Sequence, residues 1–162
     1  MFLECIPLSS LSMDTYGIQA WFLLQSVFPT AEHICVSAGS FTRLISLHDA
    51  LRVRIVLVNR RDYPGATVYD EAEMAQLRAA TSNTQEGADL MRAWFRGRSL
   101  ELYNFLEDYI QREKVTKEGG LIIAGWSLGA AFLNGLLAYA PTFRVGEVDV
   151  ASYIKYAIAY GA

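Results

Sequence analysis

The residue types best suited to chemistry in this chain lie at positions 125–129, which read Gly-Trp-Ser-Leu-Gly. An apolar run, 121–124, precedes them, and a run with helical spacing, 128–140, follows them. This context predicts a sharp turn from a strand into a helix, which would expose the hydroxyl of Ser127 above the sheet edge as a nucleophile. Such a turn strains the backbone at the serine and needs small residues two positions to either side, which the two glycines provide.

The same turn is expected to form part of an oxyanion hole. The backbone amide of Leu128 would point toward the serine oxygen, and the helix that begins there adds partial positive charge. A second donor is expected from the loop after a predicted strand at 33–37, where Gly39 and Ser40 carry the candidate backbone amides. The alternative interpretation is an ordinary strand-turn-helix in which Ser127 caps the helix.

A base for the serine is harder to find. The two histidines, His33 and His48, both precede Ser127, the first at the start of a predicted strand and the second inside a predicted helix. Both are therefore predicted to be structural or exposed rather than catalytic. Glu147 and Asp149 follow the serine but precede the last predicted strand, which places them at the wrong end of a parallel sheet. No Ser-His-Asp set can be assembled from these residues.

Hydrophobic patterning predicts alternating strands and helices along most of the chain. Strands are predicted at 33–37, 53–58, 121–124 and 154–160, and helices at 16–28, 41–51, 70–80, 84–115, 128–140 and 148–153. The long helix is expected to be interrupted or bent near Gly97, and small residues such as Gly135 should let the next helix lie close to the sheet. This alternation predicts an α/β fold, with a mostly parallel sheet flanked by helices on both faces.

The loop at 59–67 follows the second of these strands. In a parallel sheet, sites form at the carboxyl ends of the strands, so this loop should border the site. Pro64 and Gly65 fit a type II turn, in which the glycine adopts a positive φ. Arg61 and Asp62 are interpreted as residues that brace the loop rather than as catalytic groups.

The order of these elements, with the loop at 59–65 and the Ser127 pentapeptide, resembles the α/β-hydrolase superfamily, and the loop is most similar to a group of fungal members. The resemblance covers about residues 33–162 and implies a partial α/β-hydrolase fold, truncated at the C-terminus. The domain would span 31–162, with no clear assignment for 1–30. The resemblance further implies that Ser127 is the nucleophile, that the amide of Leu128 is one oxyanion donor, and that an amide at 38–40 is the other.

Two departures from the family concern its catalytic groups. Family members usually carry His-Gly near the first oxyanion loop, where this chain has Ala38 and Gly39, and their acid and histidine follow the serine. One interpretation is a serine hydrolase domain for ester, amide or related acyl substrates, with an incomplete triad in this chain. The alternative is a truncated or degenerate domain that is inactive and binds at most small apolar ligands. Whether the chain is an enzyme stays open.

Composition sets the remaining expectations. With 162 residues, 52% hydrophobic and 19% charged, the chain suits one domain with buried parallel strands. A net charge of −3 offers no basic patch for nucleic acid. Cys5 and Cys35 have no metal-binding spacing and are expected to be reduced thiols, and no cofactor is expected. Without a signal peptide or a membrane-length apolar run, a cytoplasmic location is expected, together with self-association through an exposed sheet edge.

Overall fold

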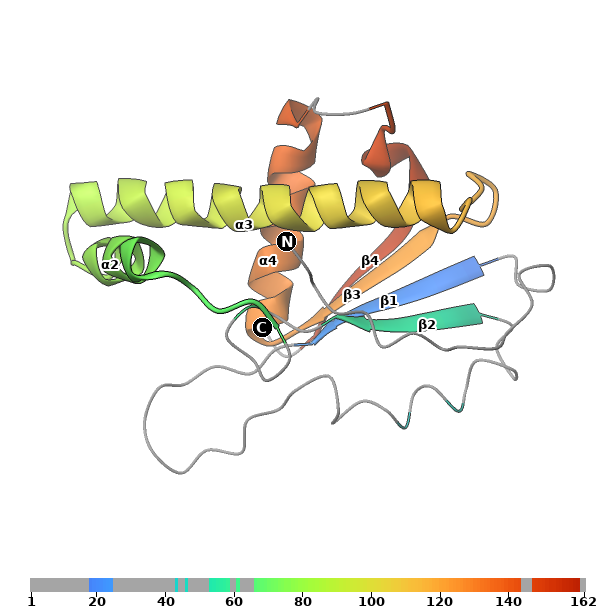
Figure 1. Cartoon of the computed structure of the whole chain (residues 1–162), viewed down its shortest axis with the longest axis horizontal. Coiled ribbons are helices and arrows are strands. Elements are labelled where there is room, and N and C mark those ends of the chain that lie inside the picture. Colours follow the sequence, from blue (N-terminus) through green and yellow to red (C-terminus); the bar gives the residue numbers. More distant parts are fainter. Residues whose placement is uncertain are drawn as a thin grey trace.

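A four-stranded parallel sheet forms the base of the computed structural model, which describes residues 18–24, 43, 46, 53–58, 61, 66–143 and 147–160 (Figure 1). Its strands are β1 (Ile18–Leu24), β2 (Val53–Val58), β3 (Leu121–Trp126) and β4 (Ile154–Tyr160), in the spatial order β2-β1-β3-β4. All three neighbouring pairs are parallel, which confirms the predicted parallel sheet. The carboxyl ends of the strands therefore share one edge, and the direction of strand addition reverses between β1 and β3.

The first strand corrects the sequence interpretation. A helix was predicted at 16–28, whereas Ile18–Leu24 forms β1 and pairs with β2 on one side and β3 on the other. A short, continuous apolar run fits a buried parallel strand as well as a helix, so periodicity alone could not distinguish the two. The strand predicted at 33–37 lies outside the described residues, as does all of the predicted helix at 41–51 except Arg43 and Ser46.

Two of the three described α-helices, α3 (Gln85–Arg112) and α4 (Leu128–Tyr139), cover one face of the sheet, while α2 (Glu71–Ala80) packs against α3 beyond the end of the sheet (Figure 1). The prediction of helices on both faces is not met within this part of the chain. The expected break at Gly97 is wrong, because α3 continues through that position. Two short 3₁₀ helices, η3 (Ala140–Thr142) and η4 (Val150–Tyr153), lead toward β4, and η4 agrees with the predicted short helix before that strand.

Local sequence explains where these helices begin and end. Asp70 and Glu73 form a reciprocal capping box at the start of α2, and the side chain of Thr84 accepts the amide of Gly87 at the start of α3. At the end of α3, the amide of Val115 donates to the carbonyl of Ile110 at 3.0 Å. This Schellman-type bond satisfies a terminal carbonyl of the helix.

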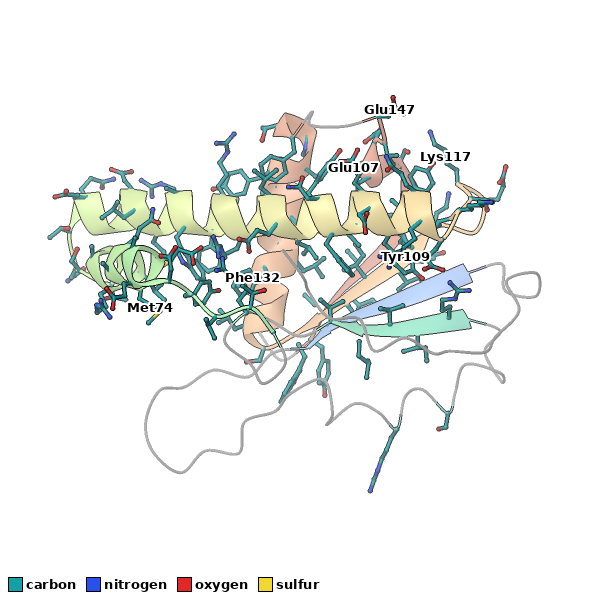
Figure 2. All side chains as sticks on the ribbon, in the orientation of Figure 1. Met74, Glu107, Tyr109, Lys117, Phe132 and Glu147 are labelled. Atoms are coloured by element: carbon teal, nitrogen blue, oxygen red, sulfur yellow. The ribbon has the colours of Figure 1, made fainter. Side chains whose placement is uncertain are left out.

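The core lies between α3, α4 and the upper face of the sheet. It joins Leu102, Tyr103, Leu106, Tyr109 and Ile110 of α3 to Val56, Val58, Leu121 and Ile123 of the sheet and to Leu133 and Leu136 of α4. The labelled Tyr109 side chain points from α3 toward the sheet (Figure 2). No helix among the described residues is both long and apolar enough to cross a bilayer.

The crossing of α3 and α4 explains the small residue in the middle of α4. A Cβ added to Gly135 would lie 2.6 Å from the hydroxyl oxygen of Ser99, which is fully buried. The Ser99 hydroxyl donates to the Phe95 carbonyl at 2.8 Å, so the buried polar group is satisfied within α3. Gly135 thus permits close packing against α3, and not against the sheet as the sequence suggested.

Candidate active site

The backbone at Ser127 has the strain expected of a nucleophile turn. β3 ends at Trp126, α4 begins at Leu128, and Ser127 between them has φ 55° and ψ −125°. Among the described residues other than glycine, only Lys114 and Ser127 have a positive φ. Lys114 follows the end of α3, where left-handed conformations are common. The ψ of Ser127 lies far from the left-handed helical region, so its conformation is costly and must be enforced by its neighbours.

Close backbone contacts enforce this turn. A Cβ on Gly125 would lie 2.6 Å from the carbonyl carbon of Gly129 and 2.8 Å from the amide nitrogen of Ala130. The structure therefore shows the close approach of the two flanking glycines that the pentapeptide predicted. The amide of Ser127 donates to the Tyr160 carbonyl at the end of β4 at 2.8 Å, and its carbonyl accepts the Ala130 amide at 2.9 Å. The serine is thus held between the end of β4 and the first turn of α4.

The surroundings of the hydroxyl favour a developing negative charge. Ser127 makes no side-chain capping bond to α4, and no hydrogen bond joins its hydroxyl to a described residue. The simple capping interpretation is therefore not supported. Leu128 is the first residue of α4, where an amide has no acceptor within the helix, and the first turn carries no acidic residue. An oxyanion beside Ser127 would meet the Leu128 amide and the positive end of the helix dipole.

An aromatic cluster holds the start of α4 against α3. The ring of Phe132 lies 5.7 Å from that of Trp94 and 5.5 Å from that of Phe95, between ring centroids. Tyr69, in the segment before α2, lies 6.2 Å from Trp94. The labelled Phe132 projects from α4 toward the α2 side of the molecule (Figure 2). These contacts fix the helix whose first turn contains Leu128.

A network of charged residues holds Arg61, which follows β2, against α2 and α3. The guanidinium of Arg61 contacts Glu73 of α2 at 2.6 Å and Glu101 of α3 at 3.0 Å, and it donates to the Val68 carbonyl at 2.9 Å. Arg98 contacts the same two carboxylates at 3.2 and 3.0 Å. These contacts of Arg61 are those expected of a bracing residue, whereas Asp62 lies outside the described residues. Sequence reasoning missed the other three members of this network, which local spacing does not connect to Arg61.

The pKa values of the two carboxyl groups in this network are shifted in opposite directions. The hydrogen bond from Arg61 lowers the pKa of Glu73 to about 2. Burial raises the pKa of Glu101, although both arginines oppose that shift. Glu73 is therefore the group whose charge this network stabilises most strongly.

The predicted catalytic candidates are not all brought together. Ser127 and Leu128 occupy the turn, whereas Gly39, Ser40, His33 and His48 lie outside the described residues. Glu147 and Asp149 are exposed and precede β4, so they lie at the end of that strand opposite to Ser127, as expected. The seven residues of β4 separate the two ends by roughly 20 Å. In Figure 2, Glu147 lies on the other side of α3 from the labelled Phe132 near the start of α4.

The described residues offer no alternative centre for metal chemistry. Within those ranges, no group of three or more His, Cys, Asp and Glu side chains is placed to hold a metal ion. Comparisons with known proteins add no assignment, because no family model, curated protein or solved structure matches the chain. The α/β-hydrolase resemblance stays a prediction from the sequence. The geometry of the turn must therefore support any functional proposal.

Proposed function

We propose that this chain carries the nucleophile and part of the oxyanion hole of a serine hydrolase of the α/β-hydrolase type, acting on esters, amides or related acyl compounds. The observation that supports this most directly is the backbone of Ser127, at φ 55° and ψ −125° between a strand and a helix. Strained conformations of this kind occur mainly at functional sites, since a purely structural turn gains nothing from them. The strand order adds support, because β1 and β3 flank the point where parallel α/β sheets bind ligands.

The chemistry would proceed by acyl transfer to the serine. The Ser127 oxygen forms a bond to the acyl carbon while its proton passes to a general base, and the carbonyl oxygen becomes an oxyanion held by the Leu128 amide. Collapse of this intermediate breaks the bond to the alcohol or amine, which takes the proton. Water then releases the acid by the same steps. The described residues include no histidine, so the base must come from elsewhere.

A second function is favoured by the lack of a base beside the Ser127 hydroxyl among the described residues. No hydrogen bond joins Ser127 to a described base, and a serine without a base retains only weak catalysis from its oxyanion donors. The domain would then be an inactive relative that binds small apolar ligands near the same turn. The hydrolase and the inactive ligand-binding domain would have the same fold, but only the hydrolase would turn over an acyl substrate.

Hydrolysis of a p-nitrophenyl ester by the whole chain separates these two functions. The hydrolase proposal predicts turnover above the buffer rate that falls at least 100-fold in Ser127→Ala. Ser152→Ala is the matched control, because Ser152 lies before β4 at the opposite end of the sheet, and its activity should equal that of the unmodified chain. Folded protein that hydrolyses the ester no faster in its original form than in Ser127→Ala would support the binding function and overturn the hydrolase.

A further inference from the structure

The outer side of β4 has no partner strand among the described residues. β4 ends the sheet, with β3 on one side, and residues 155–160 are all exposed. Natural sheets usually protect such an edge with charged residues, proline or a bulge. Here a register shift at the start of β4 leaves Lys155 as the extra residue, and no charge or proline follows it through Tyr160. The protection is therefore confined to one end of the strand.

The backbone of β4 presents hydrogen-bonding groups that have no partner strand among the described residues. The Tyr160 carbonyl accepts the amide of Ser127, so the polar groups of Tyr160 point toward β3. Backbone groups of successive residues in a strand point to opposite sides. Those of Ala157 and Ala159 consequently point away from β3, toward the open edge. A further strand could bond to them without disturbing the existing sheet.

The side chains beside this edge are apolar and lie on one face. Tyr156, Ile158 and Tyr160 are 66%, 50% and 73% exposed. They are in register with Ile122, Ala124 and Trp126 of β3, which alternate with the core residues Leu121 and Ile123. The exposed stripe therefore lies on the face away from α3 and α4. Figure 1 shows β4 at the edge of the sheet beside β3.

We infer that β4 is a homodimer interface, in which a second copy of the chain adds its own β4 in antiparallel orientation, centred on Ala157. This register pairs the outward backbone groups of the two Ala157 residues, while Tyr156 of each copy lies opposite Ile158 of the other. Such non-hydrogen-bonded pairs bring side chains closest together, and aromatic residues beside β-branched ones stabilise them. The surface is therefore self-complementary about a two-fold axis, as a closed dimer requires.

Charge selects the antiparallel orientation over the parallel one. Lys155 is the single charged residue of β4, and in the proposed register it lies opposite Ala159 of the other copy. The two lysines are then four residues apart along the strands, about 14 Å. Parallel, in-register pairing would place them directly beside each other, which is destabilising.

Analytical ultracentrifugation of the whole chain from 1 to 100 µM tests this interface. We expect a monomer–dimer equilibrium for the unmodified chain. Ala157→Pro removes the central outward amide and should weaken dimerisation at least tenfold, and Ile158→Lys should do the same by placing two new charges on the apolar face. Val68→Lys is the matched control, because Val68 is 69% exposed and lies before α2, and its dimerisation should not change.

Hydrogen exchange provides a readout that does not depend on these variants. The amides of Ala157 and Ala159 should exchange at least tenfold more slowly at 100 µM than at 1 µM, because dimerisation buries them. A monomer throughout the concentration range would overturn the inference. A dimer that persists in both β4 variants, or open-ended assembly instead of a discrete dimer, would also overturn it.

Discussion

Ser127 adopts a strained backbone conformation, at φ 55° and ψ −125°. A residue other than glycine in such a sparsely populated region costs about 1–3 kcal/mol, which the surrounding contacts must offset. Those contacts are the bond from Ser127 to Tyr160, the bond from Ala130 to Ser127, and the approach of Gly125 to Gly129. Each depends on backbone atoms, so the turn tolerates variation at Trp126 and Leu128 better than at either glycine.

Gly125→Ala tests the close approach directly. The new methyl group would meet the backbone of Gly129 and Ala130, which cannot move without distorting the turn, so we expect a loss of about 1–3 kcal/mol in the free energy of unfolding. Gly97→Ala is the matched control, because nothing lies within 4 Å of its added Cβ in the interior of α3. That control should gain about 0.5–1 kcal/mol from better helix propensity. Urea denaturation of both variants measures the two effects, and equal stability of the pair would contradict this description of the turn.

The residue scale also shows how far the sequence could predict the site. Ser127, Leu128 and the two glycines were predictable because five contiguous residues define the whole turn. Glu73 and Glu101 were not, since they lie 12 and 40 positions from Arg61 and only the folded chain brings them together. Contacts of that range depend on how α2 and α3 pack, which no local pattern records.

At the scale of elements, the charged network joins three segments that approach the site. Arg61 follows β2, Glu73 belongs to α2, and Glu101 and Arg98 belong to α3. The rings of Tyr69 and Trp94 lie beside the guanidinium of Arg98, at 5.3 and 5.8 Å from its central carbon. The network and the aromatic cluster therefore form one continuous support beside α4.

This network should make the stability of the fold depend on pH. Because Arg61 lowers the folded pKa of Glu73 from 4.5 to about 2, its contribution is present above about pH 5 and is lost as the pH falls toward 2. Glu101 acts in the opposite direction and at higher pH, since burial raises its folded pKa above 4.5 and the folded state therefore takes up its proton before the unfolded chain does. Glu73→Gln should destabilise the protein at pH 7 by about 1–3 kcal/mol, with the pair partly screened by solvent.

Thermal unfolding between pH 2.5 and 7 measures this dependence. The unmodified chain should lose more stability on acidification than Glu73→Gln, because the variant has already lost the titrating group. Glu118→Gln, at an exposed position in the turn before β3, is the control and should follow the unmodified chain. Parallel acid profiles for Glu73→Gln and the unmodified chain would show that the network does not stabilise the fold.

At the scale of the whole molecule, the sequence predicted a parallel sheet, but it did not predict every segment that forms a strand of that sheet. The alternation of strands and helices along the sequence predicted β2, β3 and β4. Each of them is bounded by turn residues or by a helix with a clear hydrophobic period. β1 was assigned to a helix since its short, continuous apolar run fits either element and periodicity alone does not distinguish the two. Its place between β2 and β3 is set by long-range pairing, which becomes visible only when the sheet is assembled.

The four-stranded sheet brings the ends of β1, β3 and β4 to the edge where Ser127 lies. Ser127 follows β3 directly and is bonded to the last residue of β4, so the serine is positioned by two strands and a helix at once. Such rigid positioning favours catalysis, because the nucleophile and its oxyanion donor keep a fixed distance and orientation. We therefore propose that Ser127, held in this way, is an activated nucleophile.

Labelling of the whole chain with a fluorophosphonate probe, followed by peptide mapping, tests that claim most directly. We predict that the probe modifies the peptide containing Ser127, that Ser127→Ala abolishes the labelling, and that Ser152→Ala leaves it unchanged. Circular dichroism confirms that each variant is folded. Folded protein that takes up no probe, or takes it up at a residue other than Ser127, would contradict the account.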